Sequence, residues 1–148
     1  MYHSLYFVKE GTDDGINTYD EWHIVPDSRP LFSPPPVRTE YVTIPGSMGA
    51  LDFTGALTGS VTYGDRTGSW TFYVLNGYQP WYELYSQIMN YIQGKKFRVW
   101  LEDDPEHYYI ARLSVDKWQS PKDWSKVKIN YTADPERYTG HNPLVEVE

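Results

Sequence analysis

Short segments in which apolar and polar side chains alternate recur along this chain, and they constrain its fold more than any other feature. Trp70, Phe72 and Val74 occupy every second position of one such segment. A period of two residues places alternate side chains on opposite faces of a β-strand. We therefore expect a mostly β fold of about seven strands, in the segments His3–Val8, Tyr19–Val25, Thr39–Ile44, Ser69–Leu75, Phe97–Leu101, Tyr108–Val115 and Trp124–Tyr131.

Two connections between these segments carry turn signals. The stretch from Glu10 to Asp20 is rich in Gly, Asp and Asn, which favour turns, so the first two segments are predicted to form a hairpin. Glu102-Asp103-Asp104-Pro105 is predicted to be a second turn, between two later strands.

One segment has a helical rather than a strand period. Between Pro80 and Gln93, apolar residues recur at spacings of three and four, which places them in one stripe along a helix. Pro80 suits a first helical turn, and Gly94 suits the position just past the end. The polar face lacks the basic residues of a membrane-surface helix. We expect the stripe to pack against the sheet through Trp81, Leu84, Tyr85, Ile88, Met89 and Ile92.

The fold class that follows is α+β and mostly β, namely a β-sandwich or open barrel with one amphipathic helix over about residues 80–93. The chain of 148 residues fits one domain. We expect that domain over residues 1–135 and a C-terminal tail over residues 136–148, where the alternating pattern is lost.

Charge and composition exclude several classes of protein. The net charge of -7 argues against a protein that binds nucleic acid, because such binding needs clustered lysines and arginines. The chain has no cysteine, which excludes disulfides and thiolate metal sites. Neither a signal peptide nor a membrane-spanning stretch is found in the sequence, so we expect no membrane insertion.

Glycines at Gly46, Gly49, Gly55 and Gly59 raise the question of a phosphate-binding loop. A P-loop requires Lys and then Ser or Thr after its last glycine, whereas here Ser60 follows Gly59 directly. The strand, GxGxxG and helix of a dinucleotide site do not occur in order either. Tight turns and bulges account better for these glycines, and we expect no cofactor.

The segment from Asp27 to Arg38 contains Pro30, Pro34, Pro35 and Pro36. Prolines cannot donate to a sheet ladder and they hold an extended conformation. Two interpretations follow: a stiff connector within the domain, which we prefer, or an arm that lies against a neighbouring subunit.

An acidic cluster of Glu102, Asp103, Asp104 and Glu106 adjoins His107. Paired carboxylates could act as acid and base, and with a histidine they could hold a divalent cation. Side chains on a turn usually point into solvent, which is the interpretation we favour. The sequence contains no HExxH and no GxSxG motif. We therefore predict no catalytic, metal-binding or cofactor-binding residues and no enzymatic activity.

The aromatic residues leave a carbohydrate-binding module open as an alternative. They make up 17% of the chain. Trp100 lies on the strand face opposite Phe97, Val99 and Leu101, so its ring could be exposed. The competing interpretation is that aromatic side chains fill the core and subunit contacts. The tryptophans that could stack on sugar rings are Trp22, Trp100, Trp118 and Trp124.

A succession of short motifs extends over most of the chain. The segment from Ile44 to Thr54 is a glycine-rich turn followed by Leu51-Asp52. Further motifs follow in order: Gly59, Tyr63, Asp65-Arg66, the strand Trp70 to Leu75, the helix end Tyr91-Ile92-Gln93-Gly94-Lys95, the acidic turn, and Tyr108, Tyr109 and Arg112. In order and spacing, this succession resembles the N-terminal domain of the distal tail protein (Dit) family of long-tailed phages, over roughly residues 3–135.

The resemblance implies a tail-tube-like fold and a structural role in the tip of a phage or prophage tail. Members of that family form a ring, usually a hexamer, between the tail tube and the tail-tip or receptor-binding proteins, and DNA passes through its lumen. The implied partners are other copies of this chain, the tail tube protein, tail-associated proteins and receptor-binding proteins. The implied location is the virion tail tip, after synthesis and assembly in the host cytoplasm. A tube or terminator protein of the same fold is an alternative, and the family's frequent second domain is expected to be missing here or truncated.

A closed ring needs a head-to-tail interface, in which one patch meets a different patch on the neighbour. We expect an acidic lumen, which would repel the DNA backbone. The candidate interface residues come from the proline-rich and glycine-rich stretches and are Arg29, Pro34, Pro35, Pro36, Arg38, Gly46, Met48, Gly49, Leu51, Asp52 and Arg66.

Overall fold

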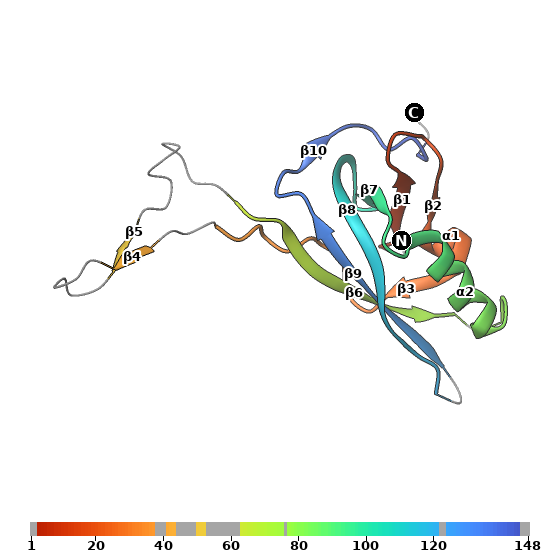
Figure 1. The fold of residues 1–148 in the computed structure, drawn as a ribbon. Coiled ribbons are helices and arrows are strands. Elements are labelled where there is room, and N and C mark those ends of the chain that lie inside the picture. Colours follow the sequence, from red (N-terminus) through yellow and green to blue (C-terminus); the bar gives the residue numbers. More distant parts are fainter. Residues whose placement is uncertain are drawn as a thin grey trace.

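The computed structural model describes residues 3–37, 41–43, 50–52, 63–75, 77–121 and 124–145. Within these residues the chain forms ten strands and two helices (Figure 1). In chain order they are β1 (Leu5–Lys9), β2 (Gly15–Asn17), α1 (Thr18–Trp22), β3 (Ile24–Pro26), β4 (Tyr41–Thr43), β5 (Ala50–Asp52), β6 (Arg66–Val74), α2 (Trp81–Ile92), β7 (Lys96–Leu101), β8 (Asp104–Gln119), β9 (Ser125–Ala133) and β10 (Tyr138–Thr139).

Eight of these strands form one curled antiparallel sheet in the order β2-β1-β7-β8-β9-β6-β3, with β10 paired to β8. The two helices lie together on one side of the sheet (Figure 1), α1 against β1, β2 and β3 and α2 against β8. Within the part of the chain that the structure describes, β4 and β5 pair only with each other, and they lie apart from the main sheet in Figure 1. The predicted mostly β fold class is confirmed, in its open-barrel form.

The core lies between α2 and the inner face of the sheet. Phe72 of β6, Phe97 of β7 and Ile129 of β9 are fully buried there, at alternate strand positions. Their neighbours in sequence face outward, as a period of two requires. Burying aromatic and branched side chains on this scale is the main favourable term in folding.

The N-terminal region differs from the predicted hairpin of two long strands. β1 pairs with the short β2 instead, and the chain then turns into α1. The Asn17 side chain caps this helix by accepting hydrogen bonds from the amides of Tyr19 and Asp20. Such caps stabilise a helix start and are hard to distinguish from a turn in sequence. Only Ile24–Pro26 remains extended, and it pairs with β6 rather than β1.

Helix α2 agrees with the predicted boundaries to within a residue. Leu84, Ile88 and Ile92 are buried, while Tyr85 and Met89 are half-buried. Trp81, expected on the same stripe, is instead 50% exposed. It occupies the first turn, where the stripe passes beyond the core, and its ring lies 6.4 Å from that of Trp118 at the end of β8. None of the described helices is long and apolar enough to cross a membrane.

The segment expected to be a tail returns to the sheet as far as residue 145. β10 pairs with β8 through Tyr138 and Tyr108, and the two rings stack. The Trp100 indole donates a hydrogen bond to the Gly140 carbonyl, and Asn142 is fully buried. The side chain of Trp100, which its strand face alone would leave open to solvent, is therefore covered, being 1% exposed.

Candidate functional site

The proline-rich segment lies along the open edge of β6. β3 pairs with only the last three residues of β6, so among the described residues the edge from Arg66 to Thr71 has no partner strand. The Asp27 amide donates to the Thr71 carbonyl, and the Trp70 indole donates to the Leu31 carbonyl at 3.0 Å. An exposed edge is a template for unwanted pairing, so covering it protects the sheet. Within one chain, the segment is thus arranged as a connector that packs against its own domain.

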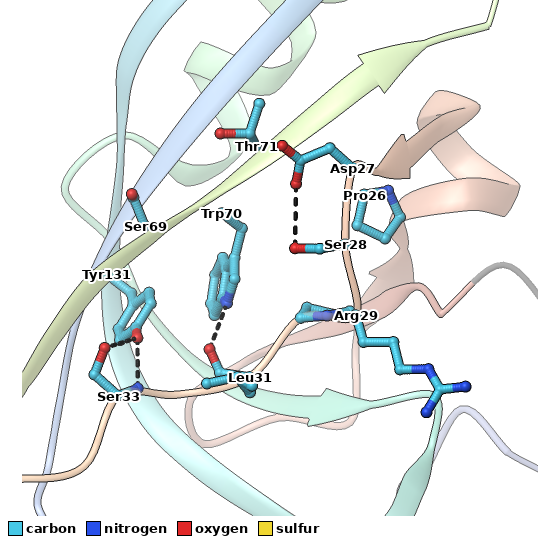
Figure 2. Close-up of a pocket in the computed structure, with 11 residues that line it drawn as sticks. Pro26, Asp27, Ser28, Arg29, Leu31, Ser33, Ser69, Trp70, Thr71 and Tyr131 are labelled. Carbon is cyan, nitrogen blue, oxygen red and sulfur yellow. Dashed lines mark hydrogen bonds between the residues drawn. The ribbon is translucent and has the colours of Figure 1, made fainter.

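Two further contacts fasten the connector. The Ser33 amide donates to the Tyr131 hydroxyl at 2.7 Å, and this hydroxyl also lies 3.0 Å from the Ser33 hydroxyl (Figure 2). Phe32 is buried, with its ring stacked 4.0 Å from that of Tyr109. Phe32 and Tyr131 therefore attach the connector to the core rather than leaving it free.

A shallow pocket lies between the connector and β6 (Figure 2). Its lining offers hydroxyls from Ser69 and Thr71 and the carboxylate of Asp27, which pairs with Ser28 at 3.3 Å. The Arg29 side chain points away from the other lining residues in Figure 2. The lining contains no histidine to act as a base towards these hydroxyls. The pocket is a packing groove with an exposed arginine at its margin.

The predicted interface residues divide into four groups. Arg29, Pro34 and Pro36 are exposed and Pro35 is half-buried, so the connector presents a surface to solvent. Arg66 instead ties parts of the chain together, because its guanidinium donates to the carbonyls of Ser33 and Pro135. Leu51 and Asp52 belong to β5, of which the backbone pairing is described. The other candidates, Arg38, Gly46, Met48 and Gly49, lie outside the described residues.

The acidic turn between β7 and β8 is divided among separate partners. His3 Nδ1 lies 2.9 Å from Asp103, and Ser4 donates its amide to Glu102 at 2.8 Å. The described residues contain no group of three or more acidic, histidine or cysteine side chains placed to hold a metal ion. The other two acids have their own histidines, Asp104 with His107 at 2.9 Å and Glu106 with His141 at 2.8 Å.

The pair of His141 and Glu106 has an electrostatic consequence. The hydrogen bond to the Glu106 carboxylate, followed by one to the Val145 carbonyl, raises the pKa of His141 above its usual value. Protonation of His141 therefore strengthens the attachment of the C-terminal segment to the start of β8.

The four tryptophans proposed for sugar stacking do not share a surface. Trp22 and Trp100 are buried, and the ring of Trp22 packs edge-on against Tyr91. Trp118 is half-buried beside Tyr85 of α2, with ring centroids 5.4 Å apart. Trp124, at 46% exposure, remains accessible at the far end of the sheet.

A surface that the sequence analysis did not single out lies at that same end, on the outer face of the sheet. The ring of Tyr73 on β6 lies 6.4 Å from that of Trp124 and carries the Lys126 ammonium 5.5 Å from its centroid. Lys117 of β8 and Lys128 of β9 line a shallow groove beside them. We call these five residues the lysine–aromatic patch. The alternation of Lys126 and Lys128 with core residues was visible in sequence, but the strand pairing that adds Tyr73 and Lys117 was not.

No protein-family profile matches this chain, and no curated protein is similar to it. Among solved structures, the chain is similar to that of the Dit protein (gp 19.1) of phage SPP1, described as a paradigm of the hub adsorption apparatus in phages that infect Gram-positive bacteria. The two share 17% sequence identity with a TM-score of 0.57, over 91% of this chain and 52% of that protein. The chain thus spans about half the length of the SPP1 protein. At this identity the likeness concerns the fold, and the chain has the fold of the Dit hub protein over most of its length.

Proposed function

We propose that this chain is a structural subunit of a phage or prophage tail tip. The observation that carries the proposal is the fold shared with the SPP1 Dit hub protein over 91% of the chain. The acidic turn, whose carboxylates are individually paired, and the pocket beside the connector, which lacks a base, are compatible with a structural rather than an enzymatic role.

In this proposal, six copies close into a ring between the tail tube and the tail-tip or receptor-binding proteins, and DNA passes through its channel. The ring assembles in the host cytoplasm and remains at the virion tail tip. The exposed connector residues Arg29, Pro34 and Pro36 stay candidates for subunit contacts. So do the residues of the glycine-rich stretch that sequence analysis selected.

The first test is the mass of the purified chain by light scattering over a concentration series, followed by electron microscopy. A closed oligomer near six times 17.3 kDa, seen as rings, is the expected result. A monomer at every concentration that also fails to join purified tail tubes would contradict the proposal. Saturable binding in a glycan screen by such a monomer would point to a carbohydrate-binding module instead.

A further inference from the structure

Two lysines of the lysine–aromatic patch lie close enough to repel each other. Lys117 and Lys128 lie opposite each other on β8 and β9, on the outer face of the sheet. Like charges directly opposite across a pair of strands are destabilising. Asp116, at the β-bulge beside Lys117, pairs with Lys128 at 3.4 Å and offsets part of this repulsion. Lys117 and Lys126 have no described carboxylate partner, so lysines outnumber carboxylates at the patch in a chain whose net charge is -7.

The aromatic members of the patch have the character of an interface. Tyr73 is 43% exposed and Trp124 46% exposed, and their rings are in contact. Tyrosine and tryptophan are enriched at the centre of protein interfaces, where they bury a large area at low entropic cost. Exposed rings surrounded by lysines therefore favour a protein partner that carries carboxylates.

The same chain carries such carboxylates at the other end of β8. This strand of 16 residues begins at the acidic turn and ends at the hairpin that bears the patch (Figure 1). An extended strand of this length spans roughly 50 Å, so the two charged surfaces of one copy cannot meet. Asp103 and Glu106 are exposed at the acidic turn. Their described ion-pair partners are His3 and His141, and neither acid has a described Lys or Arg partner.

We infer that the lysine–aromatic patch of one copy receives the acidic turn of a second copy. This inference rests on the proposed ring and names the two surfaces that meet in it. The contact is head-to-tail, because two different patches of the same chain come together, and this is the type of contact that closes a ring. It also places carboxylates against the opposed lysines, so that assembly removes the repulsion left in the single subunit.

The natural absence of cysteine allows a direct test. Lys126→Cys and Asp103→Cys are made in separate copies of the full chain, mixed and oxidised. We expect a disulfide-linked dimer in the mixture that neither variant yields alone to the same extent. Lys96→Cys, which replaces an exposed lysine on β7 outside the patch, is the matched control and should yield little product with Asp103→Cys.

A charge-reversal pair provides the second measurement. Lys126→Glu/Lys128→Glu should raise the apparent dissociation constant of the oligomer by roughly tenfold or more, because repulsive contacts replace attractive ones. The control Lys9→Glu/Lys96→Glu changes the net charge equally at exposed positions elsewhere and should leave the assembly intact. Thermal melting of each variant separates loss of assembly from loss of folding.

The outcomes distinguish this inference from the proposed function. If the natural chain forms rings, but the cysteine pair does not cross-link and charge reversal leaves the mass unchanged, the inference is wrong while the ring remains. If the natural chain stays monomeric, does not join purified tail tubes and forms no cross-link, both are wrong. A preferential cross-link between Lys126→Cys and Asp103→Cys supports the inference even where the ring itself dissociates on dilution.

Discussion

At the scale of single residues, the connector depends on a few polar atoms. The Tyr131 ring stacks on the Trp70 ring with centroids 4.5 Å apart, and its hydroxyl accepts a hydrogen bond from the Ser33 amide. Gly68 lies directly beneath, and a Cβ built there would come within 2.5 Å of the Tyr131 oxygen. Glycine is therefore required at this position, because any side chain there would collide with the Tyr131 hydroxyl that holds the connector.

Replacing Tyr131 with Phe keeps the stacked ring and removes this acceptor. The Ser33 amide then loses its described hydrogen bond, and the free energy of unfolding should fall by about 1 kcal/mol. Urea denaturation of the variant and the natural chain measures the change. Tyr82→Phe, at a tyrosine that is 56% exposed, is the control and should leave stability unchanged. Equal stability of Tyr131→Phe and the natural chain would show that the connector does not depend on this bond.

Tyr91 should respond in the opposite way to the same substitution. Its hydroxyl is buried without a described hydrogen-bond partner, and burial, followed by the nearby Asp14 and Glu21, raises its pKa to about 12. A buried polar group without a partner costs free energy, so Tyr91→Phe should preserve or increase stability, by up to about 1 kcal/mol. Urea denaturation measures this, and a clear loss of stability would reveal a partner for the hydroxyl.

His141 makes the attachment of the C-terminal segment depend on pH. Its pKa is raised in the folded chain, so its stabilising contribution is fully present below the unfolded pKa, about 6.5, and is lost as pH rises through the folded value. The backbone amides of Gly140 and Asn142 donate to the backbone carbonyls of Glu106 and Pro105, so their hydrogen exchange should speed up at higher pH beyond the intrinsic increase. His141→Gln should abolish this extra dependence. An NMR titration giving His141 a pKa at or below 6.5 would count against the pair with Glu106.

At the scale of elements, secondary structure could be predicted from the sequence where one face of a strand or helix packs against the core. The periods of β6, β7, β9 and α2 follow directly from alternation or a helical stripe, because their inner side chains are buried. Trp22 shows where prediction from periodicity fails, because a buried tryptophan is compatible with a strand or a helix. The Asn17 cap favours the helix α1 here. The candidate surfaces were less predictable. Covering of Trp100 and assembly of the lysine–aromatic patch depend on pairings between residues far apart in sequence.

Helix α2 provides a direct comparison of buried and exposed positions. Ile88→Ala removes a fully buried side chain against the sheet and should cost 2–5 kcal/mol of unfolding free energy, as large-to-small core changes do. Trp81→Ala, on the same predicted stripe but 50% exposed, should cost about 1 kcal/mol or less. Thermal or urea unfolding ranks the two variants. A larger loss for Trp81→Ala would mean that its contact with Trp118 contributes more than burial indicates.

At the scale of the whole molecule, both ends of the described chain meet the same turn. His3 and Ser4 bind its first two acids, and His141 binds Glu106. The β7–β8 turn thus joins the start of β1 to the segment after β10 and closes one end of the curled sheet. This arrangement makes the C-terminal segment part of the fold.

Ending the chain at Asp134 tests this role. The truncated protein lacks β10 and the cover over Trp100, so the indole should become solvent-exposed and its hydrogen bond to Gly140 is lost. We expect a red shift of tryptophan fluorescence. We also expect the free energy of unfolding to fall by about 2 kcal/mol, which lowers the melting temperature by several degrees. Trp100→Phe in the full chain controls for the loss of the indole alone. An unchanged spectrum and melting temperature would make the segment a mere appendage.

The length of β8 has a mechanical consequence. Its hydrogen bonds join β7 and β10 at its start and β9 along its second half, so one continuous strand connects both ends of the sheet. A force applied along this strand loads those bonds in shear, and many must break together before the strand can slide. We therefore expect the subunit to resist extension along this strand, and to yield first at the β-bulge between Val115 and Lys117, where the ladder with β9 is interrupted.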